Sequence, residues 1–241
     1  MSNVFDDVGA PAKKEMVLFF VIDRSGSMSG TKMGAVNTAI REVLPELKGI
    51  GGSDAIIKIA VLLFSSGVDW MYAEPISVND FQWNSVEAFG LTEFGAACTE
   101  LGEKMSRSAF LNAASASVAP AIFLMSDGQP TDAYKKGLEK LQGNRWFKNA
   151  IRIAVAIGDD ADANVLAEFA GNSEAVIRVH TPEALKKMIR FVSVTSSQIG
   201  SVSQPIFEDS AVTLKQDSMV QAIQDMQTDA DFTDAAADDW D

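Results

Sequence analysis

Five side chains in three separate segments have the types and the order that could bind a metal ion. Asp23, Ser25 and Ser27 form a D-x-S-x-S pattern directly after an apolar run. Thr92 lies in a later loop that precedes a predicted helix, and Asp127 follows a second apolar run and precedes a glycine. Together they offer two carboxylates and three hydroxyls. Such hard oxygen donors suit Mg²⁺, Mn²⁺ or Ca²⁺ and are poorly matched to zinc or copper.

Each of these pieces has a simpler explanation when it is taken alone. Ser25 and Ser27 have the residue type that commonly caps a following helix. Asp127 stands in an Asp-Gly pair, which is typical of a turn. Thr92 alone indicates almost nothing. The metal hypothesis therefore depends on the three segments occurring in this order, each in the expected context.

Four near-continuous apolar runs provide that context. A run without polar alternation is typical of a central strand that is covered on both faces of a sheet. Each run stops abruptly at small or polar residues, and ligands of doubly wound sheets bind beyond the carboxyl ends of the strands. The polar ends are therefore expected at one edge of the sheet. The four runs are Met16–Ile22, Ile56–Phe64, Ala121–Met125 and Ile151–Ile157.

Helical patterns alternate with these strands, which predicts an α/β fold with a doubly wound, mostly parallel central sheet. Val68–Val78 is expected to return as one antiparallel edge strand, and Val176–Val179 as a short edge strand. Pro45 is expected to kink the first helix or to end it early. The predicted helices are Lys32–Leu47, Glu93–Phe110, one capped by Thr131 or Asp132, Ala163–Phe169 ending near Gly171, and one from Pro182 to Val194 capped by Thr181.

Composition excludes several classes of function. The net charge of −13 argues against binding to nucleic acid or to anionic membranes. The single Cys98 allows neither an intrachain disulfide nor a cysteine-based zinc site, and the single His180 allows no histidine network. The N-terminus does not resemble a signal peptide, and no apolar run has the length of a membrane span, so a soluble, cytoplasmic protein is expected.

The chain is divided into three parts on the same grounds. Residues 1–14 are expected to be a leader segment and residues 15–196 a single domain. Residues 197–241 are expected to be a C-terminal extension, with one short helix over Asp217–Gln227 and an acidic tail that is flexible in isolation.

The D-x-S-x-S pattern, the distant threonine and the later Asp-Gly pair together resemble the von Willebrand factor A (vWA) domain family and its metal-ion-dependent adhesion site (MIDAS). The resemblance covers about residues 15–196 and fills all five motif positions, Asp23, Ser25, Ser27, Thr92 and Asp127. It implies a vWA, Rossmann-like fold, a bound Mg²⁺ (or Mn²⁺ or Ca²⁺), and a partner protein whose Asp or Glu completes the metal shell. It implies an interaction module and not an enzyme.

Two short segments, residues 90–97 and 123–132, are similar to bacterial TerY-like proteins of tellurite resistance. That similarity implies a scaffold in a stress response, with a protein kinase or a protein phosphatase as partner. Some of these proteins carry a C-terminal zinc ribbon. This chain has too few cysteines and histidines for one, which puts the partner set in doubt.

Three alternatives stay open at this point. A Mg²⁺-dependent hydrolase or phosphotransferase is possible on a similar sheet, but Ser25 stands where such a phosphatase needs an acid/base residue. An acidic residue of the tail, between Asp229 and Asp241, is a conceivable ligand of the site itself. The aromatic residues near the antiparallel edge, Trp70, Tyr72, Phe81 and Trp83, belong to the core by default or contribute an exposed binding patch.

Overall fold

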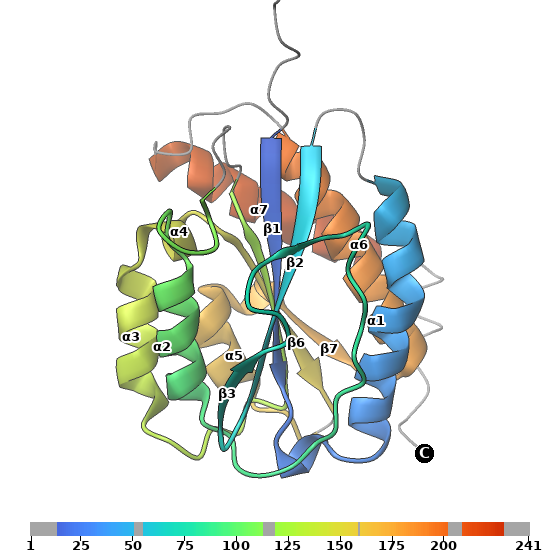
Figure 1. Ribbon diagram of the computed structural model, residues 1–241, viewed down its shortest axis with the longest axis vertical. Helices are drawn as coiled ribbons and strands as arrows, with labels where there is room; N and C mark the ends of the chain where they lie inside the picture. Colours follow the sequence, from blue (N-terminus) through green and yellow to red (C-terminus); the bar gives the residue numbers. More distant parts are fainter. Residues whose placement is uncertain (1–13, 51–54, 113–118, 159, 202–208, 229–241) are drawn as a thin grey trace, which may run out of the picture.

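The sheet expected from the sequence is present in the computed structural model, which describes residues 14–50, 55–112, 119–158, 160–201 and 209–228. Its strands lie in the order β3-β2-β1-β5-β6-β7 (Figure 1). The short β4 also pairs with β2. All pairs except those of β3 and β4 with β2 are parallel. The strands are β1 (Lys14–Asp23), β2 (Ala55–Ser65), β3 (Gly67–Trp70), β4 (Ile76–Ser77), β5 (Ala121–Ser126), β6 (Ile151–Ile157) and β7 (Val176–Val179).

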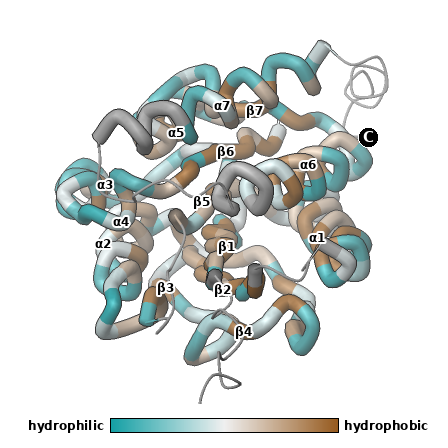
Figure 2. The backbone as a smooth tube through the Cα atoms, turned by 90° about the horizontal axis from the view of Figure 1, so that it is seen from above, coloured by the Kyte–Doolittle hydropathy of each residue, from teal (hydrophilic) through white to brown (hydrophobic). Residues whose placement is uncertain are grey.

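Two helix layers cover the sheet. One face packs against α1 and α6, and the opposite face packs against α2, α3 and α5, while α7 contributes residues to both cores. Viewed from above, the hydrophobic strands β1, β5 and β6 run between these layers (Figure 2). The helices are α1 (Thr31–Ile50), α2 (Phe94–Lys104), α3 (Tyr134–Gly143), α4 (Arg145–Lys148), α5 (Ala163–Ala170), α6 (Pro182–Ser201) and α7 (Asp209–Gln227), with 3₁₀ turns η1 (Gly26–Met28) and η2 (Ser173–Ala175).

The central strand β1 shows why its sequence is apolar without interruption. Alternate side chains point to opposite faces of a strand. Phe20 packs against Phe123 of β5 in the α1 core, while Phe19 packs against Trp70 and Phe110 in the α2 core. Both phenylalanines are fully buried. A polar residue at either position would have no water to contact, which is why both faces are hydrophobic.

The first helix continues through Pro45, so the expectation that it ends early is wrong. Leu44 and Leu47, on either side of the proline, are buried at 6% and 0% exposure. The apolar stripe therefore stays packed against the sheet beyond the proline. Burial of this kind outweighs the loss of one backbone hydrogen bond at Pro45.

Three other predictions differ from the structure, two in the extent of an element and one in a helix cap. The helix expected over Glu93–Phe110 ends at Lys104. Instead of one return strand over Val68–Val78, two short strands, β3 and β4, pair with β2. Neither Thr131 nor Asp132 caps α3, because both side chains bond to the segment that starts α2, as described below. The ends at Gly171 and Thr181 are confirmed: Gly171 closes α5 with φ 78°, and the Thr181 hydroxyl accepts from the Ala184 amide.

The helix expected over Asp217–Gln227 is present and begins earlier, at Asp209. The predicted boundary between residues 196 and 197 falls inside α6. Residues 1–13 and 229–241, which contain most of the leader and the acidic tail, lie outside the described part of the chain. Within that part, none of the helices combines the length and the apolar character that crossing a membrane requires.

Gln216 attaches α7 to the sheet. Its side chain accepts from the Arg152 amide at 3.0 Å and donates to the Arg152 carbonyl at 2.9 Å. β7 pairs with β6 only from Ala154 onward, so Gln216 takes the place of a strand at Arg152. Replacing Gln216 with alanine leaves two backbone groups unpaired and is expected to lower the free energy of unfolding by about 1–3 kcal/mol. Urea denaturation measures this loss.

The matched control is Gln221→Ala on the same helix, where the glutamine is exposed and its side chain donates to the exposed Asp225. That variant is expected to unfold within about 0.5 kcal/mol of the wild type. Equal losses in the two variants would contradict the attachment at Arg152.

Candidate metal centre

The site lies where the sheet changes its winding direction. β1 and β5 are neighbours, with Ile22 beside Met125. The chain leaves β1 for α1 on one face and leaves β5 for α3 on the other face. Diverging connections of this kind open a crevice at the carboxyl ends of the two strands. The loops that follow Asp23 and Ser126 face each other across it.

Asp23 ends β1 and is completely buried. Its Oδ1 accepts from the Ser25 amide at 2.8 Å, and its Oδ2 accepts from the Ser126 hydroxyl at 2.6 Å. Burial raises the pKa of Asp23 above its usual range, the hydrogen bonds from Ser126 and Ser25 oppose this shift, and the Asp127 carboxylate adds to it. Both oxygens are thus occupied in holding the loop and the neighbouring strand.

Ser25 and Ser27 point to a common position. Their hydroxyl oxygens lie 3.0 Å apart, with Ser25 buried and Ser27 exposed. Ser25 precedes η1, yet its side chain makes no capping hydrogen bond to that turn. The capping explanation of Ser25 is therefore not what the structure shows, and its hydroxyl is available to a ligand next to Ser27.

Hydrogen bonds from the neighbouring loops hold the loop of Thr92 at the site. The Thr92 amide donates to the Thr131 hydroxyl at 3.0 Å, and the Thr131 amide donates to the Thr92 carbonyl at 2.9 Å. On its other side, the Gly26 amide donates to the Gly90 carbonyl at 3.0 Å. Thr92 itself is 4% exposed. These bonds hold the Thr92 loop between the loops that follow β1 and β5.

Asp132 strengthens the same arrangement. Its carboxylate accepts from the amides of Gly95 and Ala96, in the first turn of α2, with a shortest distance of 2.9 Å. A carboxylate at a helix N-terminus satisfies amides that have no partner in the helix and interacts favourably with the helix dipole. The loop after β5 therefore fixes the start of α2, and with it the position of Thr92.

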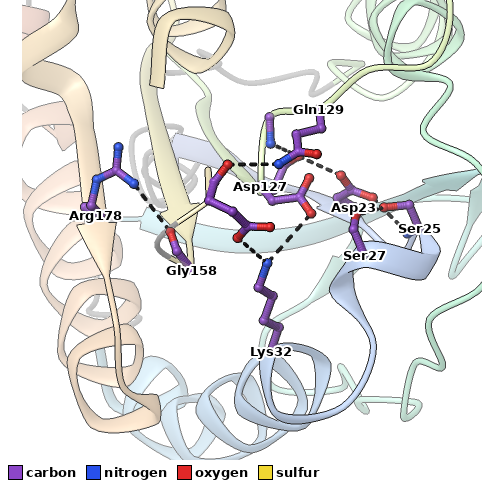
Figure 3. Close-up of polar contacts among 11 residues, drawn as sticks. Asp23, Ser25, Ser27, Lys32, Asp127, Gln129, Gly158 and Arg178 are labelled. Carbon is purple, nitrogen blue, oxygen red and sulfur yellow. Dashed lines mark hydrogen bonds and ion pairs between the residues drawn. The ribbon is translucent and has the colours of Figure 1, made fainter. Parts of the chain in front are cut away.

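Asp127 is the most unusual residue of the site. Its side chain is fully buried, and neither carboxylate oxygen has a hydrogen-bond partner. The nearest cation is the Lys32 ammonium, whose Nζ lies 3.9 Å from Oδ2 (Figure 3). A buried carboxylate is costly unless it is paired and hydrogen-bonded. Asp127 therefore has oxygen atoms available for a cation, beside the hydroxyls that the motif places there.

The backbone around Asp127 is closely packed. Its carbonyl accepts from the Asp162 amide at 2.7 Å, and Gly128 has φ +70°. A Cβ on Gly128 would lie 2.5 Å from the Asp162 carbonyl oxygen, so only glycine fits. The Asp-Gly pair thus forms a tight turn, as the local pattern indicates, and the turn holds Asp127 in its buried position.

Some residues of the site have no signal in the sequence pattern. Ser126 bonds to both Asp23 and the Gly128 amide, although it stands outside the D-x-S-x-S motif. Lys32 appeared only as the first residue of an amphipathic helix. Asp160 bonds to Lys32 and follows β6, not β1 or β5. The sequence indicated Asp160 only indirectly, because the polar residues that follow each apolar run were expected at this edge of the sheet.

The surroundings of the site are partly apolar. Phe89 and Leu91 lie three residues and one residue before Thr92, and they are 51% and 56% exposed. The Arg24 guanidinium lies 4.7 Å from the centre of the Phe89 ring and forms an ion pair with Asp69. Next to Arg24, a groove of about 510 Å³ runs between β3 and residues 84–89.

The aromatic residues near the antiparallel edge are packed inward instead. Phe81 is buried, and Trp70, Tyr72 and Trp83 are partly buried against the two cores. The exposed aromatic side chain near the site is Phe89, which sequence reasoning did not single out.

Comparison with known proteins places the chain in a family. Residues 18–191 match the family model of the von Willebrand factor type A domain. Among solved structures, the chain is similar to a von Willebrand factor type A protein from Catenulispora acidiphila, with 21% identity, a TM-score of 0.55, and coverage of 76% of this chain and 43% of that chain.

Two further structures show the same fold. The ArnB paralog VWA2 from Sulfolobus acidocaldarius is 22% identical, with a TM-score of 0.52 and coverage of 74% and 44%. Proximal thread matrix protein 1 from the mussel byssus, in a structure with a zinc-occupied MIDAS motif, is 17% identical, with a TM-score of 0.57 and coverage of 76% and 49%.

In each of these comparisons the match spans less than half of the solved chain. No curated protein matches the sequence. The similarities at this level of identity show the fold, and the family model covers most of the chain. The fold, an α/β sheet with one antiparallel edge, agrees with this match over residues 18–191. The chain belongs to the von Willebrand factor type A domain family.

Proposed function

We propose that the crevice above β1 and β5 holds one divalent cation, and that the cation binds an acidic side chain of a partner protein. The observation that carries this proposal is the fully buried Asp127 carboxylate, whose two oxygens have no hydrogen-bond partner. It lies beside hydroxyl ligands of the type that the MIDAS motif requires. Members of the family are commonly protein-interaction modules.

The residues have different tasks in this proposal. Ser25, Ser27 and Thr92 are the neutral ligands, and Asp127 supplies charge directly or through water. Asp23 has both oxygens engaged by Ser25 and Ser126, so it orients the loop and acts on the cation mainly through those groups. A cation held chiefly by neutral oxygens keeps most of its charge and attracts an incoming carboxylate.

The ligand chemistry favours Mg²⁺, Mn²⁺ or Ca²⁺ over zinc, because all the donors are oxygens. The mussel protein has zinc in its MIDAS motif. Zinc therefore belongs in the test as a competitor.

The exposed side chains Phe89 and Leu91 support a protein as the ligand. They lie next to Thr92 in the chain and offer apolar contact area beside the cation. A partner carboxylate would supply the charge-assisted contact, and the surrounding loops would supply the specificity. A kinase or phosphatase partner and a role in tellurite resistance are finer parts of this proposal that rest on the short TerY-like segments. A cytoplasmic location, as expected from the sequence, is proposed with them.

Hydrolysis is disfavoured by the state of Asp23. The nucleophile of the alternative mechanism would have to be this aspartate, which is fully buried with both oxygens hydrogen-bonded. Ser25, two residues later, cannot shuttle a proton as a carboxylic acid does.

Calorimetric titration of the metal-free protein with Mg²⁺, Mn²⁺, Ca²⁺ and Zn²⁺ tests the proposal. The wild type is expected to bind one equivalent. The double variant Ser25→Ala/Ser27→Ala is expected to lose at least about tenfold in affinity, because two ligands are removed while the buried core is unchanged. Melting curves of the metal-free proteins verify that the variant is folded.

Ser29→Ala is the matched control, since Ser29 is exposed and lies just after η1. It is expected to bind the metal like the wild type. Equal binding by the wild type and the double variant would overturn the metal site, as would no binding by either protein.

A further inference from the structure

Lys32 lies beside the candidate metal centre and takes part in none of the contacts proposed so far. It is the second residue of α1, and its side chain is only 16% exposed. Its Nζ bonds to Asp160 Oδ1 at 2.7 Å and lies 3.9 Å from Asp127 Oδ2 (Figure 3). The lysine is thus shared between a buried carboxylate and an exposed one, since the Asp160 side chain is 59% exposed.

The loop after β6 is shaped around this lysine. Gly158 has φ +93°, and a Cβ there would lie 2.5 Å from Lys32 Cε and 2.8 Å from Nζ. The side-chain amide of Gln129, which lies two residues after Asp127, donates to the Asp160 carbonyl at 2.9 Å. Arg178 of β7 also contacts the loop, through the Gly158 carbonyl at 3.4 Å. Asp160 is therefore held near Asp127, and Lys32 has little room to leave.

The charges explain what such a lysine does. The Asp127 carboxylate has no hydrogen-bond donor among the described residues, and the Lys32 ammonium is the positive charge that lies beside it. A divalent cation at Asp127 would meet the same ammonium at close range in a poorly solvated crevice, where charges are weakly screened. The direct bond to Asp160 is shorter than the contact to Asp127, so Asp160 draws the ammonium away from the site.

We propose that Lys32 is the internal counter-charge of Asp127 and competes with the divalent cation, and that Asp160 sets the strength of this competition by holding the lysine. The competition rests on the function proposed above. Metal affinity in this chain then also depends on two residues outside the five motif positions. Lys32 binds no metal itself and acts only through its charge.

A double-mutant cycle with Mg²⁺ as the probe tests this inference. Lys32→Gln is expected to raise the Mg²⁺ affinity about tenfold, because the competing charge is gone. Asp160→Asn is expected to lower the affinity about threefold or more, because the released lysine turns to Asp127. In the Lys32→Gln background, the Asp160→Asn effect is expected to shrink at least threefold, since there is no lysine left to release.

Lys58→Gln is the matched control. Lys58 also forms an ion pair, with Glu15 at 2.8 Å, but it lies near the amino end of β2, at the opposite edge of the sheet. It removes the same charge from the chain and is expected to leave the Mg²⁺ affinity unchanged. An unchanged or lower affinity in Lys32→Gln, with the wild type binding Mg²⁺, would overturn the inference and leave the proposed function intact. Equal Asp160→Asn effects in both backgrounds would also overturn it.

A metal-free measurement separates this inference from the proposed function. Without metal, Lys32→Gln is expected to lower the melting temperature more than Lys58→Gln does, because Asp127 loses its nearest counter-charge. If neither the wild type nor Lys32→Gln binds any metal, the proposed function falls and the competition with it. The counter-charge role is then supported by a lower melting temperature and overturned by an unchanged one.

Discussion

Replacing Asp127 with asparagine is expected to abolish metal binding and, at the same time, to make the metal-free protein more stable. The wild-type carboxylate is fully buried and has no hydrogen-bond donor, so its charge is costly in the metal-free state. Asparagine has nearly the same shape and carries no charge. We expect the free energy of unfolding of the metal-free protein to rise by about 1–3 kcal/mol, measured by urea denaturation, and the Mg²⁺ affinity to fall at least a hundredfold.

The combination is what makes this result informative. Replacing a residue that is retained for stability lowers the free energy of unfolding. Replacing a residue that serves only as a metal ligand lowers the metal affinity and leaves the metal-free protein at least as stable. Asp80→Asn, at an exposed turn position, is the matched control and is expected to change neither quantity. A drop of more than about 1 kcal/mol in Asp127→Asn would show that the carboxylate is retained for the stability of the metal-free protein, and would contradict the metal explanation.

Replacing Gly137 with alanine adds one methyl group, and among the glycines of the described chain we expect this replacement to lower the free energy of unfolding the most. Gly137 of α3 lies so close to α2 that a Cβ would be 2.1 Å from the Gly95 carbonyl oxygen and 2.9 Å from its Cα. Backbone atoms cannot move aside as a flexible side chain does, so the two helices must separate. We expect the free energy of unfolding to fall by about 3 kcal/mol or more, measured by urea denaturation.

The same substitution connects packing to the site. α2 begins two residues after Thr92, and the loop of Thr131 and Asp132 leads into α3. Separating the helices at Gly95 and Gly137 displaces the bonds that hold Thr92, so the Mg²⁺ affinity is expected to fall together with stability.

Gly34→Ala is the matched control for this prediction. Gly34 lies in α1, and a Cβ there has open space around it. Alanine is the better helix former, so this variant is expected to gain about 0.5–1 kcal/mol. A Gly137→Ala variant that is as stable as the wild type would show that α2 and α3 can slide apart without cost.

Much of this architecture follows from the sequence alone. The four apolar runs became central strands because a segment without polar alternation can be buried only between two helix layers. The motif serines and aspartates came to one edge because the strands that precede them are parallel neighbours. The ends at Gly171 and Thr181 are also local, because φ above zero and side-chain capping depend on a few adjacent residues.

Other features were decided only by tertiary contacts. Asp132 had the right residue type to cap the helix that follows it, and that helix is the nearer one along the chain. Its carboxylate instead accepts from the amides of α2, more than thirty residues earlier in the sequence. Pro45 is tolerated because leucines on both sides of it are buried against the sheet. These outcomes depend on which surfaces meet, and local propensity does not contain that information.

Lys32 is the clearest case. In the sequence it starts an amphipathic helix, and Asp160 is 128 residues away. Parallel strands bring the ends of β1, β5 and β6 to one edge, which places Asp160 and Asp127 on either side of the same ammonium. The sequence by itself determined the fold, and it predicts the five residues and the oxygen chemistry proposed for the site. The tertiary structure decided which charge faces the buried Asp127, because Coulomb interactions depend on distance in space and not on separation along the chain.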